Sequence, residues 1–376
     1  MQPLKTYFVT GATGAVGSAI VPVLLQDPAT QVVLLIRASS EAELNARLEM
    51  LHDFWQVAPE DTAFRKRVRA VRGDATVNRF GICDAQYKAL CASCTHIIHA
   101  AGAVRMNLPI EEARRSAVGS ARAIVAFAKD CAHLEKIEFV STVGVGGRLP
   151  LVPEDWVTEP RSFHNTYEQA KAEAEDYIRE EVARGLPLTV HRPSMVVGDS
   201  RTGRIIHFQV FYHICEFLSG RRTFGLYPPL GGATLDTVPV DVVARAIIWS
   251  SGQPTLVAKV LHLCAGPEGA VALRELRREV RLLFACAGVA TTPSITLPRP
   301  AFLALLRAVG WFGGEANRRA ISTLPIFLDY LESQTVFQST LSNGILPAVC
   351  IAATPWQTNV RVALNTYLRW AHPREG

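Results

Sequence analysis

Short apolar segments alternate with helical stretches through the first two-thirds of the chain. Segments with helical periodicity separate strand-like ones, and this is the pattern of a parallel sheet joined by crossover helices. The sequence therefore predicts an α/β fold, a doubly wound parallel sheet buried on both faces. The predicted strands are Thr6–Thr10, Val32–Ile36, Val68–Arg72, His96–His99, Ile137–Ser141 and Leu188–Arg192. The predicted helices lie near Val16–Leu25, Ala42–Phe54, Ala85–Leu90, Ile110–Ala128 and Tyr167–Arg184.

The alternation stops after Gly198, and a turn-rich break follows at Pro228–Gly232. A helix is predicted from Pro239 to Trp249, and a strand at Val260–Cys264 is expected to return to the sheet edge. With 376 residues, the chain is long enough for a large body and a smaller lobe. We predict a nucleotide-binding body over residues 1–200, with returns at about 233–265, and a mostly helical substrate-binding lobe over 201–232 and 266–376.

Composition and charge exclude several classes of protein. Hydrophobic residues make up 49% of the chain and charged residues 19%, which is ample for a buried core and unlike a disordered chain. The formal net charge of +5 is spread along the length, without a stripe of basic and aromatic residues, so we expect no nucleic-acid partner. No 18 apolar residues run uninterrupted, so we expect no membrane insertion.

The eight cysteines have irregular spacing, and the chain begins without a signal-peptide pattern. Both features favour reduced thiols and a cytoplasmic location. Cys91 and Cys94, with His96 and His99, superficially resemble a zinc box. The spacing after the cysteines is too short, and both histidines fall on or beside a predicted strand, so we expect no metal site. The oligomeric state stays open.

A glycine motif follows the first predicted strand and opens the first helix. It reads Gly11-Ala12-Thr13-Gly14-Ala15-Val16-Gly17. Glycines at such a turn let backbone amides approach a pyrophosphate, whose charge the helix N-terminus stabilises. The first two glycines are three positions apart, which resembles the short-chain dehydrogenase/reductase superfamily. We therefore expect Gly11, Thr13, Gly14, Ala15, Val16 and Gly17 to bind a dinucleotide.

The end of the second strand bears on the choice between NADH and NADPH. Arg37 stands 20 positions after Gly17, where an acidic residue would bind a ribose 2′-hydroxyl and an arginine a 2′-phosphate. We therefore predict NADPH. Arg47 is a second candidate cation for this phosphate, with a plain surface arginine as the alternative. The superfamily resemblance also implies contacts from Asp74 near the adenine and from Ala100, Ala101 and Gly102 along the ribose and nicotinamide.

Tyr167 and Lys171 begin the helix after the fifth strand. Residues four apart share a helix face, so the phenol and the ammonium can point toward one nicotinamide. A nearby cation is expected to lower the pKa of the phenol toward the range a proton donor needs. The superfamily resemblance adds a Ser or Thr at the end of the fifth strand that bonds the substrate oxygen. Thr142 aligns best with it, and Ser141 is the fallback.

A narrower resemblance joins these motifs. Together they are similar to the thioester reductase and fatty acyl-CoA reductase branch of the extended short-chain reductases, over roughly residues 5–265. The resemblance rests on Gly11–Gly17, Leu35–Ala38, Gly73-Asp74, His99–Gly102, Ser141-Thr142, His164–Tyr167 with Lys171, Arg192–Ser194 and Gly198–Gly203. Relatives commonly carry an Asn where this chain has Ser116. Beyond residue 265, only Leu324–Tyr330 and Val336-Phe337 are faintly similar to helices that cover an acyl pocket.

The resemblance implies NADPH-dependent reduction of an acyl thioester, on coenzyme A or a carrier protein, to the aldehyde and in some members to the alcohol. Tyr167 would donate the proton, Lys171 would hold the nicotinamide ribose, and Thr142 would position the oxygen. Pro193 and Ser194 are expected at the cofactor as well. Three alternatives stay open: a reductase of free aldehydes or ketones, an enzyme acting on a nucleotide-sugar, and a non-catalytic NADP sensor.

Overall fold

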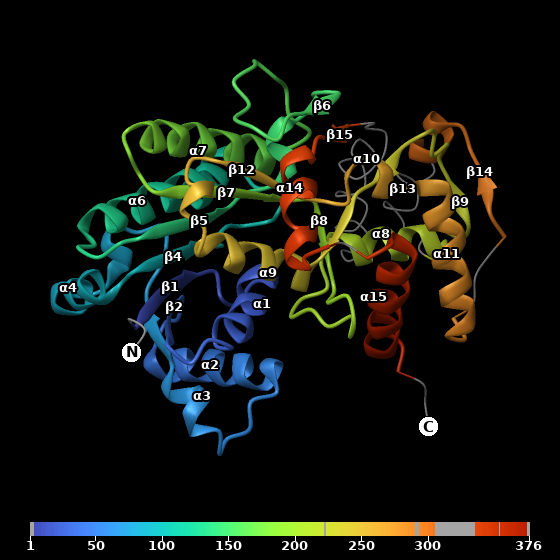
Figure 1. Cartoon of the computed structure of the whole chain (residues 1–376). Helices are drawn as coiled ribbons and strands as arrows, with labels where there is room; N and C mark the ends of the chain where they lie inside the picture. Colours follow the sequence, from blue (N-terminus) through green and yellow to red (C-terminus); the bar gives the residue numbers. More distant parts are fainter. Residues whose placement is uncertain (1–3, 222, 290–292, 305–334, 353, 374–376) are drawn as a thin grey trace.

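The computed structural model describes residues 4–221, 223–289, 293–304, 335–352 and 354–373. Seven parallel strands form its central sheet in the order β12-β7-β5-β4-β1-β2-β3 (Figure 1). All six predicted strands are present, and the predicted seventh pairs with β7 at the edge. The strands are β1 (Lys5–Thr10), β2 (Thr30–Ile36), β3 (Val68–Arg72), β4 (His96–His99), β5 (Lys136–Val140), β7 (Leu188–Pro193) and β12 (Val260–Leu263).

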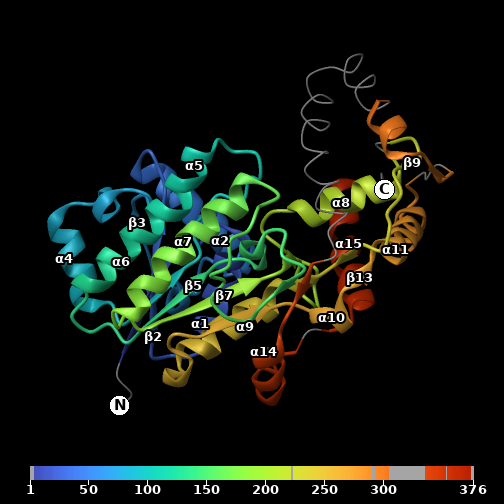
Figure 2. The same ribbon diagram turned by 90° about the horizontal axis from the view of Figure 1, so that it is seen from above.

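Helices cover both faces of the sheet, as Figure 2 shows from above. One buried cluster joins the sheet to α1 (Ala15–Leu24), α2 (Glu41–Trp55) and α9 (Val240–Ser251). A second joins the opposite face to α4 (Asp84–Ser93), α6 (Ser120–Asp130) and α7 (Thr166–Ala183). The predicted doubly wound sheet is therefore confirmed. A short helix, α3 (Thr62–Lys66), precedes β3.

The helix predicted over Ile110–Ala128 is divided. It consists of α5 (Ile110–Arg114), a π-helical turn over Arg115–Gly119, and α6. In this turn the hydroxyl of Ser120 donates to the carbonyl of Ser116 at 2.6 Å, and the Ser116 hydroxyl accepts from the amide of Ala103 at 2.8 Å. The turn thus brings Ser116, where relatives commonly carry Asn, against the chain that follows β4.

A second group of helices lies beside the sheet, toward the right of Figure 1. Its buried cluster contains Phe211 and Tyr212 from α8, Phe284 from α11, and Leu364 from α15. The predicted covering segment Leu324–Tyr330 lies outside the described residues, and the predicted boundary at residue 200 stays a prediction. The elements are α8 (Val210–Ser219), β9 (Leu226–Tyr227), β10 (Thr234–Leu235), α10 (Gly266–Gly269), β13 (Val271–Ala272), α11 (Leu273–Cys286), β14 (Ile295–Thr296) and α15 (Trp356–Ala371).

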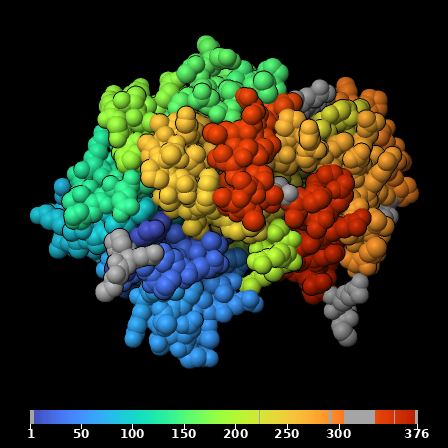
Figure 3. Space-filling model, viewed as in Figure 1, coloured from blue at the N-terminus to red at the C-terminus, as the bar shows by residue number. Residues whose placement is uncertain are grey.

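Two small strand pairs connect the lobe and the sheet. β8 (Met195–Val197) pairs with β11 (Thr237–Pro239), directly before α9. β15 (Val336–Phe337) pairs with β6 (Leu151–Val152), and α14 (Thr340–Ile345) follows it. The carboxylate of Glu154 accepts hydrogen bonds from the backbone amides of His262, Leu341 and Ser342, which ties this late segment to the body. Figure 3 shows α14 on the surface, in red, beside the gold segment of α9.

None of the helices in the described ranges has both the length and the apolar character needed to cross a bilayer.

Candidate active site

The glycine motif forms a close-packed turn at the carboxyl end of the sheet. Gly11 has a φ of +76°, and a Cβ there would lie 2.5 Å from the carbonyl carbon and oxygen of Ala100. A Cβ on Gly17 would lie 2.2 Å from the carbonyl oxygen of Gly11. Only glycine fits at both positions. The turn therefore places the start of α1 directly against the chain that leaves β4, as a dinucleotide-binding turn requires.

Two connected cavities follow this turn, and we call them together the dinucleotide groove. The adenosine cavity has a volume of about 210 Å³ and the catalytic cavity about 310 Å³. They share Gly14 and the Ala100–Gly102 segment. The structure thus brings nearly all of the predicted cofactor residues to one groove, while Gly17 packs beneath Gly11. The adenosine cavity adds Gly11, Thr13, Arg37, Arg47 and Asp74, and the catalytic cavity adds Ala15, Val16, Lys171, Pro193 and Ser194.

Thr142, Tyr167 and Lys171 line the catalytic cavity together. The Thr142 hydroxyl interacts with the phenol of Tyr167 and acts to lower its pKa. The Thr142 hydroxyl also accepts from the amide of Gly144 at 3.1 Å, which caps the 3₁₀ turn after β5. The Lys171 ammonium donates to the carbonyl of Val140 at 2.9 Å and would stand 4.0 Å from a Cβ on Gly102. Ser141 lines the same cavity, but Thr142 makes the contact with Tyr167.

Burial shifts the pKa of both titratable groups of this trio. It raises the pKa of Tyr167 to about 12, against the lowering effect of the Thr142 hydrogen bond. It lowers the pKa of Lys171 to about 8, against the raising effect of Glu175. The expectation that Lys171 lowers the pKa of Tyr167 is therefore wrong for this structure, because desolvation of the phenol dominates. Tyr167 keeps its proton near neutrality and is available as a donor.

Glu168 lies in the same cavity and was not singled out from the sequence. Its side chain is buried, and its carboxylate accepts from the amide of His164 at 3.0 Å. Its own amide donates to the side chain of Asn165 at 3.0 Å, so Asn165 caps α7. The Asn-x-x-Glu spacing is that of a capping box, which is the signal that could have found Glu168.

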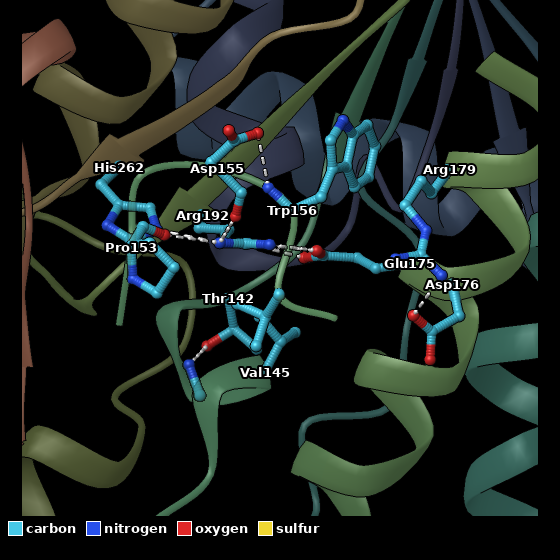
Figure 4. A network of polar contacts seen from close by, with 12 residues as sticks. Thr142, Val145, Pro153, Asp155, Trp156, Glu175, Asp176, Arg179, Arg192 and His262 are labelled. Atoms are coloured by element: carbon cyan, nitrogen blue, oxygen red, sulfur yellow. Dashed lines mark hydrogen bonds and ion pairs between the residues drawn. The ribbon is translucent and has the colours of Figure 1, made fainter. Parts of the chain in front are cut away.

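Arg192 holds the helix that carries Tyr167 and Lys171. Its side chain is fully buried on β7, and its guanidinium contacts both carboxylate oxygens of Glu175 on α7, the shortest contact being 2.6 Å. It also donates to the carbonyls of Pro153 and Asp155 and lies 3.1 Å from a ring nitrogen of His262. Figure 4 shows the guanidinium between Glu175 on one side and Pro153 and His262 on the other. Arg192 therefore has a structural role. It attaches α7 to β7 through Glu175, one helical turn after Lys171.

A third cavity of about 290 Å³ adjoins the catalytic cavity, and we call it the lobe cavity. The two share Val143, Gly144, Glu168 and Met195. The lobe cavity continues past Asp236 toward Gly266 and the β15 strand. It therefore offers room for a substrate between the sheet and the lobe.

The residues of the apparent zinc box have other partners. The ring of His96 stacks on Tyr7, and Nδ1 of His99 lies 2.8 Å from the Thr10 hydroxyl. Burial lowers the pKa of His99 to about 3. The thiol of Cys94 contacts the carbonyl of His96. Within the described ranges, no three His, Cys, Asp or Glu residues are grouped so that they could hold a metal ion.

The chain is similar to one protein family and to several known proteins. The family model described as "Male sterility protein" matches residues 9–247. The isonitrile lipopeptide synthase of Streptomyces coeruleorubidus is 31% identical over 263 residues, which is 69% of this chain and 17% of the synthase. The glycine betaine reductase ATRR of Emericella nidulans is 26% identical over 69% of this chain and 21% of the reductase. The chain thus spans about a fifth of the length of these relatives.

A solved structure matches the whole chain. The terminal R domain from the myxalamid PKS-NRPS biosynthetic pathway superposes with a TM-score of 0.81 at 25% sequence identity. The match covers 100% of this chain and 93% of that one. The structural similarity therefore extends beyond residue 265, where the motifs of the sequence resemblance end.

Proposed function

The chain belongs to the male sterility protein family, whose members bind a nicotinamide dinucleotide, and from this we propose that it reduces acyl thioesters to aldehydes with NADPH. The observation that carries the proposal is that Thr142, Tyr167 and Lys171 line one cavity of the dinucleotide groove together with the Ala100–Gly102 segment. The close-packed glycine turn fits such a cofactor, since a Cβ on Gly11 or Gly17 would collide with the backbone that forms the groove.

The reaction requires hydride at a carbonyl carbon and a proton at its oxygen. When bound, the cofactor supplies the hydride. Thr142 positions the thioester oxygen, and Tyr167 donates its proton as negative charge develops there. The resulting hemithioacetal breaks its carbon–sulfur bond, releasing the thiol and leaving the aldehyde. Lys171, in the same cavity as the phenol, would hold the ribose hydroxyls of the cofactor.

The substrate is proposed to be an acyl chain on a carrier protein or on coenzyme A. The lobe cavity supports this, because it opens into the catalytic cavity beside Gly144 and offers space for an acyl chain or a thioester arm. Similarity to a lipopeptide synthase and to the terminal R domain of a PKS-NRPS pathway favours the carrier-bound form. Similarity to the glycine betaine reductase of Emericella nidulans supports a reductase activity.

A direct assay separates thioester reduction from its nearest alternative. NADPH oxidation is followed at 340 nm, in roughly neutral buffer, with an acyl-pantetheine thioester and with the corresponding free aldehyde. We expect oxidation with the thioester and release of one free thiol per aldehyde formed. Turnover of the aldehyde alone would indicate a carbonyl reductase instead, and binding without any turnover would indicate an NADP sensor.

Arg37 is proposed to recognise the 2′-phosphate of NADPH. It lines the adenosine cavity at the end of β2. A charge-assisted hydrogen bond contributes about 1.5–3 kcal/mol, so Arg37→Ala should raise the NADPH dissociation constant roughly tenfold to hundredfold and leave that of NADH nearly unchanged. Arg69→Ala is the matched control, because this exposed arginine on β3 lines no cavity of the groove. Equal loss of both cofactors would contradict the assignment.

A further inference from the structure

The carboxylate of Glu43 occupies a set of anion-binding groups at the adenosine end of the groove. One oxygen accepts from the backbone amide and the hydroxyl of Ser39, at 2.7 and 2.6 Å. The other accepts two hydrogen bonds from the Arg47 guanidinium, at 3.0 and 2.7 Å. We call Ser39 and Arg47, with these four donors, the anion cradle.

The anion cradle is continuous with the dinucleotide groove. Ser39 and Arg47 line a cavity of about 680 Å³ together with Arg37 and Arg72. This cavity shares Arg37, Arg47 and the Gly73-Asp74 pair with the adenosine cavity. The ribose end of a dinucleotide in the groove therefore lies beside the cradle.

The donors of the anion cradle suit a phosphate as well as a carboxylate. A backbone amide, a hydroxyl and a two-pronged guanidinium are the groups that proteins use for phosphate oxygens. Arg37 and Arg72 add two more guanidinium groups around the same cavity. A second anion can enter the cradle only when the Glu43 carboxylate leaves, because all four donors point at its oxygens.

Helix capping accounts for part of this arrangement. Ser40 is the N-cap of α2, and Glu43 stands three positions later, as in a capping box. The cap itself is the contact between the Ser40 side chain and the Glu43 amide, and the Glu43 carboxylate adds the contact to the Ser39 amide, one residue before the cap. The cap does not need the two contacts with Arg47, which hold the carboxylate at the cavity of about 680 Å³ beside the groove.

We propose that Glu43 is an internal competitor for the 2′-phosphate of NADPH, and that this cofactor binds by displacing the carboxylate from the anion cradle. The inference rests on the proposed use of NADPH. NADH carries a hydroxyl at this position and leaves the Glu43 contacts in place. Glu43 therefore reduces the affinity for NADPH without a matching effect on NADH, and so limits how strongly the protein prefers NADPH.

The test measures cofactor affinity directly. NADPH and NADH are titrated into the full chain by calorimetry, for the wild type, Glu43→Gln and Glu43→Ala. An exposed carboxylate–guanidinium pair is a weak interaction, so both variants should bind NADPH roughly two- to fivefold more tightly and NADH with unchanged affinity. Glu43→Gln keeps a capping-box acceptor, and Glu43→Ala removes the side chain, so agreement between them separates competition from helix capping.

Two controls sharpen the result. Glu41→Gln removes the same charge from the same first turn of α2, but Glu41 pairs with Arg72 at 3.4 Å and does not enter the cradle. It should change NADPH affinity by less than either Glu43 variant. In an Arg47→Gln background, Glu43→Gln should lose its effect, because the contact that holds the carboxylate in the anion cradle is already gone.

The possible failures are distinguishable. If the wild type prefers NADPH but both Glu43 variants bind it no more tightly, the carboxylate is only a helix cap and the competitor role is overturned. If Glu41→Gln gives the same gain, the effect is one of overall charge, which also overturns it. If the wild type binds both cofactors equally, the proposed use of NADPH fails together with the competitor role.

Discussion

Tyr167→Phe should strongly slow thioester reduction while leaving NADPH affinity within about twofold of the wild type, since the change removes no charge from the groove. The substitution removes the hydroxyl that interacts with Thr142 and keeps the aromatic ring. General acid catalysis contributes about 10²–10⁴-fold, so kcat for an acyl-pantetheine should fall by at least about a hundredfold. The measurement is steady-state NADPH oxidation, paired with a calorimetric NADPH titration on the same preparation.

Tyr177→Phe is the matched control for this prediction. Tyr177 lies on the same helix, outside the catalytic cavity, with its ring beside Arg122. The control should retain nearly the full rate. Substantial activity in Tyr167→Phe, or equal loss in both variants, would show that the phenol in the catalytic cavity is not the proton donor.

Glu175→Gln should lower the free energy of unfolding by about 3–5 kcal/mol, because it leaves the fully buried guanidinium of Arg192 without its counter-charge. Removing one member of a buried pair strands the other charge in a low-dielectric interior. The measurement is urea denaturation followed by circular dichroism, with the slope and midpoint fitted together.

Glu173→Gln provides the comparison on the same helix. Glu173 pairs with Arg114 at 2.7 Å, but both side chains are about a third exposed, so its loss should cost less than about 1 kcal/mol. Similar small losses in both variants would mean that the Arg192 pair contributes little to holding α7.

The sheet could be predicted because its signals are local. Each strand is a short apolar segment, and the crossover helices between them leave only a parallel arrangement. The trio of Thr142, Tyr167 and Lys171 could be anticipated for a similar reason. Two of its members share one helix face, and the third lies just after the end of β5, so the fold itself brings them to one cavity. Their catalytic roles stay predictions until the variants are measured.

Three features of the site could not be predicted, because they depend on contacts that sequence spacing does not encode. Arg192 and Glu175 lie 17 positions apart on different elements, so their pairing follows only from the packing of α7 on the sheet. The raised pKa of Tyr167 depends on how completely the phenol is buried, which the nearby lysine does not reveal. Glu43 and Arg47 are an ordinary helical pair in sequence, and only the Ser39 contacts and the adjoining cavity relate them to the cofactor.

Isotope transfer tests the central claim most directly. NADPH deuterated at C4 of the nicotinamide, prepared separately on each face, is incubated with the protein and an acyl-pantetheine thioester, and the aldehyde is trapped and analysed by mass spectrometry. The account predicts one deuterium on the aldehyde carbon from one of the two labelled cofactors, one free thiol per aldehyde, and labelled aldehyde formed at least about a hundredfold more slowly by Tyr167→Phe. Consumption of NADPH without label in an aldehyde, or labelled aldehyde formed equally well by Tyr167→Phe, would contradict it.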